Sequence, residues 1–185
     1  VQKYRATHAR QRTSKVHAVC ADAARNLAML NLLRGERAAF EGMMLEARKA
    51  GDRTRDRDRW LVACDNAMAS AYAARQEGHF RDAMAHMDGI PPPETEADAD
   101  YLVARRAIEL ANVARNLGLF RESAALLSPL LDAVSPTTME AGRRPEAPQV
   151  LSMMAWHFVG VTWMERAVYH GDDAARAQAD VALRR

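Results

Sequence analysis

Small and apolar residues follow the three- and four-residue spacing of amphipathic helices along most of this chain, and strand-like runs of Val and Ile are almost absent. Three stretches share one order: a helix of small and apolar residues, a glycine, a short polar turn and a second helix. They cover residues 26–52, 67–91 and 108–131. A fourth, weaker copy surrounds Gly171. The pattern predicts an all-α protein built from about three to four helical hairpins.

The turn glycines of the three clear copies are Gly35, Gly78 and Gly118, which are 43 and 40 residues apart. Glycine enters the left-handed backbone conformation without a Cβ clash, and a residue in that conformation commonly ends a helix. We therefore expect each glycine to be the hinge of an antiparallel helix hairpin. Repeats of this length, in which each hairpin buries its apolar face against its neighbours, are typical of solenoids.

The helices expected from this pattern are 15–34, 37–50, 58–77, 80–88, 97–117, 120–133, 148–169 and 172–184. Ser14 is expected to cap the first helix, and Pro148 fits the first turn of the seventh. Two longer loops are expected at 89–96 and 134–147, where proline and glycine interrupt the helical pattern.

Composition and charge agree with a globular helical protein. Hydrophobic residues make up 49% and charged residues 27% of the 185 residues, and 37 are alanine, the best helix former. The net charge of +2 provides no strong field for nucleic acid or an anionic membrane surface, and no apolar run approaches the length of a membrane span. We therefore expect neither partner.

The termini and cysteines complete the expected organisation. Residues 1–17 are basic and contain no acidic residue, and we expect 1–14 to be a flexible, solvated end. We expect one helical repeat domain over residues 1–185, which we interpret as a fragment of a larger protein. Cys20 and Cys64 lie in Ala-rich helical stretches, so we expect two small buried residues and a reducing, cytoplasmic location.

Residues around the turn glycines resemble the motif of the tetratricopeptide repeat family. The motif has small residues in the first helix, glycine at the turn, an aromatic residue two positions later and alanine three after that. The second copy provides Ala71, Ala74, Gly78, Phe80 and Ala83, and the third provides Ala111, Ala114, Gly118, Phe120 and Ser123. The first provides Ala28, Gly35 and Ala39 with Arg37 at the aromatic position, and the fourth only Gly171 and Ala174.

This resemblance covers residues 20–133 well and implies a right-handed superhelix of stacked hairpins. The spacing of 40–43 exceeds the 34 usual for the family and is similar to the divergent repeats of bacterial signalling proteins. Such arrays often precede an output domain such as a diguanylate cyclase or a transcription activator. The resemblance therefore implies a regulatory module that binds a protein or peptide.

The family's concave face, lined by the first helix of each hairpin, implies the candidate binding residues. Counted back from the turn glycines, they are Tyr72, Arg75, Gln76, Arg105, Asn112, Arg115 and Asn116. On the third copy these positions fall on one helix face. Arginine and asparagine there suit a carboxylate or a peptide backbone, because the guanidinium offers a bidentate fork. The alternative is that the same face is only a polar, solvated stripe.

A second candidate surface lies in the stretch LSMMAWHFVGVTWMERAVY, which is apolar nearly all round. Trp156 and Trp163 are seven residues apart and share a helix face. A helix of this kind is normally buried, so we expect a missing helix, another domain or a second copy of the chain to cover it. Homodimerisation through this helix is therefore a further hypothesis.

Motifs that carry catalysis or bind metal are missing from the sequence: no phosphate-binding glycine loop, zinc spacing or nucleophile elbow occurs. We expect no enzyme, no cofactor and no metal. The leading interpretation is thus a protein- or peptide-binding module. The alternatives are a sensor that holds a small molecule or signalling peptide in the concave groove and, third, an enzyme, which would need a cluster of His and acidic residues.

Overall fold

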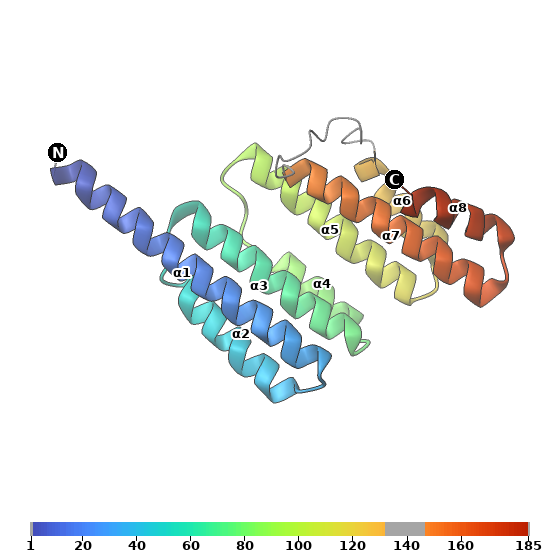
Figure 1. The fold of residues 1–185 in the computed structure, drawn as a ribbon, viewed down its shortest axis with the longest axis horizontal. Coiled ribbons are helices and arrows are strands. Elements are labelled where there is room, and N and C mark those ends of the chain that lie inside the picture. Colours follow the sequence, from blue (N-terminus) through green and yellow to red (C-terminus); the bar gives the residue numbers. More distant parts are fainter. Residues whose placement is uncertain (1, 132–146, 185) are drawn as a thin grey trace. The chain divides into compact units, whose positions relative to one another are not determined.

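The computed structural model describes residues 2–131 and 147–184, and every regular element within these ranges is an α-helix. Figure 1 shows a short turn within each of the pairs α1 and α2, α3 and α4, α5 and α6, and α7 and α8. Their bounds are α1 Gln2–Leu33, α2 Arg37–Gly51, α3 Asp56–Gln76, α4 Phe80–Asp88, α5 Glu96–Asn116, α6 Phe120–Leu131, α7 Ala147–His170 and α8 Asp173–Leu183. The all-α prediction is confirmed. Most expected boundaries agree within two residues, and the loop expected at 134–147 lies almost entirely outside the described residues.

The beginning of the chain differs from the prediction. Helix α1 begins at Gln2, not near residue 15, so residues 2–14 belong to a helix of 32 residues. Ser14 consequently lies inside α1 and does not cap it. Its buried hydroxyl donates to Asp58 Oδ2 at 2.8 Å and accepts from the Arg55 N–H at 3.2 Å. Ser14 therefore satisfies a backbone donor at the start of α3, a helix distant in sequence.

The turn glycines have the predicted conformation, with φ of 77° at Gly35, 79° at Gly78 and 77° at Gly118. At the first turn the Gly35 N–H donates to Leu32 O and the Glu36 N–H to Asn31 O, both at 2.9 Å. The same two bonds end α3 and α5, which identifies the Schellman motif. Gly171 also has positive φ, at 62°. The prediction that these glycines hinge helix hairpins is confirmed.

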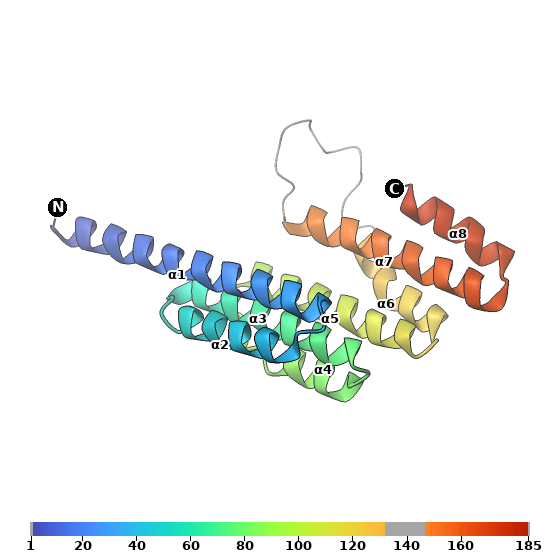
Figure 2. The ribbon, with the colours of Figure 1, turned by 60° about the horizontal axis from the view of Figure 1, so that its bottom comes forward.

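The contacts divide the chain into two compact units, residues 1–94 and 95–185. In the first unit α1 pairs with α2 and α3 pairs with α4, and α3 also packs against both α1 and α2 (Figure 1). In the second unit α5 pairs with α6 and α7 with α8, and α7 packs against both α5 and α6 (Figure 2). Each unit thus consists of two hairpins in which the third helix contacts both helices before it.

Equivalent positions around the turn glycines are buried in each of the first three hairpins. Seven residues before the glycine the side chain is alanine, and nine residues after it a large apolar side chain is almost fully buried. These residues are Ala28, Ala71 and Ala111, followed by Met44, Met87 and Leu127. Tight alanine contacts bring the helices together, and the long side chains fill the space that remains.

Two hairpins differ from the expected motif residues. In the first, the buried residue after the turn is Phe40, not the expected Ala39; Phe40 lies five positions after its glycine, as Ala83 and Ser123 do, and the Arg37 guanidinium lies 5.1 Å from its ring centroid. In the fourth, Ala174 is exposed and Ala175 is buried. A shift of one residue moves a helical side chain by about 100° around the axis, so it exchanges buried and exposed positions.

The cysteines also differ in environment. Cys64 is fully buried, as predicted, whereas Cys20 is exposed on α1. The small residues around Cys20 indicated packing on that face, but α1 buries another face against its neighbours in the first unit.

Candidate partner-binding site

The three candidate residues of α3 have different environments. Arg75 is buried, and its guanidinium lies 5.1 Å from the centroid of the Tyr72 ring. Tyr72 is half-buried and Gln76 is exposed. Tyr72 and Gln76 therefore remain accessible to a partner, whereas Arg75 is buried beside the Tyr72 ring.

Tyr72 and Gln76 line a pocket of about 370 Å³ in the first unit. The same pocket is lined by the end of α1 and by the first turn, through Leu32, Leu33, Gly35, Arg37 and Glu77. The first helices of two neighbouring hairpins thus contribute to one pocket, and its role as a binding groove stays a prediction. The α1 and turn residues were missed from the sequence, because the groove positions were assigned only for the second and third copies.

An ion pair lies beside this pocket. Arg37 Nη1 is 2.6 Å from Glu77 Oε1, which connects the first residue of α2 to the turn after α3, and Arg37 Nε is 3.0 Å from Glu41 Oε1. These side chains are about 35–62% exposed, so solvent screens the pairs and they add little stability. Arg37 and Glu77 therefore add charged groups to a pocket that is otherwise lined by leucine, glycine, tyrosine and glutamine.

An exposed apolar stripe on α1 reaches this pocket. Its members are Val16, Val19, Leu27, Leu30 and Leu33, which are 59%, 68%, 45%, 52% and 70% exposed. Their spacing places them within about a third of the helix circumference over roughly 26 Å. Leu33 belongs to both the stripe and the pocket. Apolar residues gathered in this way on a surface are typical of binding sites for other proteins.

The candidate residues of α5 are directed mainly into the second unit. Arg105 Nη1 lies 3.3 Å from Met154 Sδ, and Arg115 Nε lies 3.6 Å from Glu165 Oε2, so both arginines contact α7. Asn112 is buried at 3% exposure, and Asn116 is exposed at the end of α5. The two arginines hold α5 against α7 in this structure, and a binding role for this set stays a prediction.

Trp156 and Trp163 are partly buried against the core of their own unit, a cluster that includes Ile108, Leu127 and Val159. The Arg166 guanidinium covers Trp163 at 5.6 Å from the ring centroid. The second unit itself therefore provides much of the cover that the sequence assigned to a missing helix or a second copy. Exposed apolar side chains on α7 lie elsewhere, at Met153, Met164, Val168 and Tyr169. Homodimerisation stays a prediction.

One carboxylate has a perturbed environment. Asp172 precedes α8 and caps it, because its Oδ1 accepts from the Ala175 N–H at 3.0 Å and its Oδ2 accepts from Arg166 Nε at 2.8 Å. The backbone hydrogen bond first, and the arginine second, lower the pKa of Asp172 below its usual value. This carboxylate joins α7 to α8 and has the role of a helix cap.

The described ranges contain neither a metal-binding cluster nor a helix suited to span a membrane. In residues 2–131 and 147–184 no group of three His, Cys, Asp or Glu side chains is arranged to hold a metal ion. None of the helices there combines the length and hydropathy that crossing a membrane demands.

Comparison of the chain with protein-family models, with curated proteins and with solved structures gave no match. The resemblance to tetratricopeptide repeats therefore rests on the hairpin residues and on the glycine turns alone.

Proposed function

We propose that this chain is a protein-binding module of the helical-repeat type, which holds an amphipathic helix of a partner along α1. The observation that carries the proposal is the exposed apolar stripe of α1, which leads through Leu33 into the pocket containing Tyr72 and Gln76. The repeated glycine turns and the similar helix contacts within each unit support a repeat scaffold of stacked hairpins.

A helical partner suits this surface because the stripe follows one face of α1 with helix spacing. Two helices pack when the apolar ridge of one fits the other along a shared line. The pocket at the end of the stripe would accept one larger apolar side chain beside the Tyr72 ring. The Arg37–Glu77 pair beside it would give polar contacts that fix the direction of the partner.

The size of the expected effect follows from Leu33. Burying a whole leucine side chain contributes about 2 kcal/mol. Leu33 is 70% exposed, so covering this exposed part with a partner contributes roughly 1.4 kcal/mol, or about tenfold in affinity. Glutamine is also a good helix former, so Leu33→Gln should lower the affinity for a partner helix by about tenfold without unfolding α1.

The test uses a displayed library of peptides patterned as amphipathic helices, with a second library in which the apolar positions are scrambled. We expect binders only from the patterned library, and titration of the selected peptides should show the loss with Leu33→Gln. Leu45→Gln is the matched control, because Leu45 is 51% exposed on α2, in the same unit but outside the stripe. Absence of any enriched peptide, or an equal loss with both variants, would overturn the proposal.

A further inference from the structure

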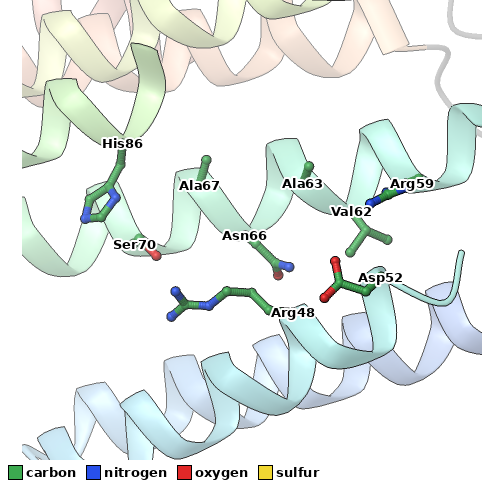
Figure 3. A pocket seen from close by; sticks show the side chains of 10 residues that line it. Arg48, Asp52, Arg59, Val62, Ala63, Asn66, Ala67, Ser70 and His86 are labelled. Carbon is green, nitrogen blue, oxygen red and sulfur yellow. The ribbon is translucent and has the colours of Figure 1, made fainter. Parts of the chain in front are cut away.

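A second pocket, of about 260 Å³, opens in the first unit between α2, α3 and α4. Its lining on α3 includes the small side chains of Ala63, Ala67 and Ser70, and α4 contributes His86. Figure 3 shows these α3 residues along one helix, with the α2 residues opposite. Pockets for drug-sized ligands usually exceed about 300 Å³, so this one suits a smaller molecule.

Asn66 is the unusual residue of this pocket. It is only 8% exposed, and in the described part of the chain its side-chain oxygen, Oδ1, has no hydrogen-bond partner. A buried acceptor without a donor is unfavourable and rare in native proteins. In Figure 3 the Asn66 amide projects from α3 toward α2, between Arg48 and Asp52. The missing donor can therefore come from a molecule in this pocket.

The two charged residues beside Asn66 lie four positions apart at the end of α2, where opposite charges commonly pair. Among the residues that the structure describes, however, neither Arg48 nor Asp52 takes part in an ion pair. Arg48 Nε donates to Met44 O at 3.2 Å, and Figure 3 shows its guanidinium turned toward Ser70 and His86, away from Asp52. The pocket thus presents the Arg48 cation and the Asp52 anion separately, with an unsatisfied acceptor between them, and Arg59 of α3 adds a second cation to the lining.

We propose that this pocket binds a free α-amino acid. The carboxylate of the amino acid pairs with the Arg48 guanidinium, which offers parallel donors that match its two oxygens. The ammonium, which has three donors, binds Asn66 Oδ1 and the Asp52 carboxylate. The small α3 residues leave space for a short side chain near Ser70 and His86. A ligand with only one of the two charges would leave Arg48 or the Asn66–Asp52 pair unpaired.

The experiment measures binding of L-alanine and L-serine to the full chain by calorimetry and by the rise in Tm with ligand concentration. Propionate lacks the ammonium and L-alaninamide lacks the carboxylate, so we expect each to bind at least about tenfold more weakly than L-alanine. Inorganic phosphate should cause no shift. If no amino acid binds, or if propionate or phosphate binds as well as L-alanine, the proposal is wrong.

Three variants locate the site. Arg48→Gln and Asp52→Asn change exposed side chains, and each should lower the affinity for L-alanine at least about tenfold. Asn66→Leu should abolish the response to L-alanine while the free protein remains folded, because it removes an unsatisfied buried acceptor. Arg53→Gln, an exposed neighbour outside the lining, should bind L-alanine normally. Unchanged binding by Arg48→Gln and Asp52→Asn would exclude this pocket, whether or not Asn66→Leu folds.

Discussion

The glycine hinges can be tested by making one substitution at two positions of the same hairpin. Gly35 has φ of 77° in the turn between α1 and α2, whereas Gly42 lies inside α2. An added Cβ would meet no atom within 4 Å at either position. Alanine therefore creates no clash with neighbouring groups at Gly35 or Gly42, and the two variants differ only in backbone conformation.

The expected effects have opposite signs. An L-residue in the left-handed conformation costs about 1–2 kcal/mol, and the stiffer unfolded chain of alanine offsets roughly 0.5 kcal/mol of this. Gly35→Ala should thus lower the free energy of unfolding by about 1 kcal/mol. Gly42→Ala should raise it by about 1 kcal/mol, because alanine inside a helix is favoured over glycine by that amount.

Urea unfolding followed by circular dichroism measures both variants on the transition of the first unit. We expect the midpoints to move in opposite directions with unchanged m-values, since the surface exposed on unfolding stays the same. Gly78→Ala should behave like Gly35→Ala, because its φ is 79° and its surroundings are equally open. A Gly35→Ala variant as stable as the wild type would refute the view that these glycines are needed for their conformation.

Three further predictions concern packing, a distant cap and pH. Leu127 is fully buried in the second unit, so Leu127→Ala should cost about 3 kcal/mol in chemical unfolding, against less than about 0.5 kcal/mol for Val181→Ala at a 58% exposed position. Ser14→Ala removes the hydroxyl that is hydrogen-bonded to Asp58 and Arg55 and should lower the free energy of unfolding by about 1 kcal/mol, whereas alanine at the exposed Lys15 should have little effect. Because the folded-state pKa of Asp172 is lowered, its carboxylate stabilises the fold fully above about pH 4, and this stabilisation is lost as the pH falls through the folded-state pKa. The Tm values of the wild type and of Asp172→Ala should therefore differ at pH 7 and converge in acid, and a difference that does not change with pH would contradict the assignment.

The helix hairpins were predictable from the sequence because their causes are local. A helix boundary depends on the periodicity, on proline and on the glycine that follows, all within a few residues. The three hinge glycines therefore have the predicted φ, and α4 occupies the expected residues. The first helix was predicted too short because the basic residues before Ser14 gave no sign of the helical start at Gln2.

The candidate site was predictable only in part. Tyr72 and Gln76 line a pocket, whereas Arg105 and Arg115 contact α7, and a binding role for all four stays a prediction. The number of residues between a position and the turn glycine predicts which face of its own helix that position occupies. It does not give the neighbour that packs on that face, which depends on helices far away in sequence.

The sequence by itself determined the all-helical class and the glycine-hinged pairs, since backbone preferences act over one or two helical turns. Only the tertiary structure decided which polar groups are satisfied and which surfaces stay open. Ser14 is hydrogen-bonded to the start of a helix more than forty residues later, whereas the buried Oδ1 of Asn66 has no donor within the part of the chain that the structure describes. Burial and hydrogen bonding are properties of surfaces that meet in space, so neither can be deduced from one helix alone.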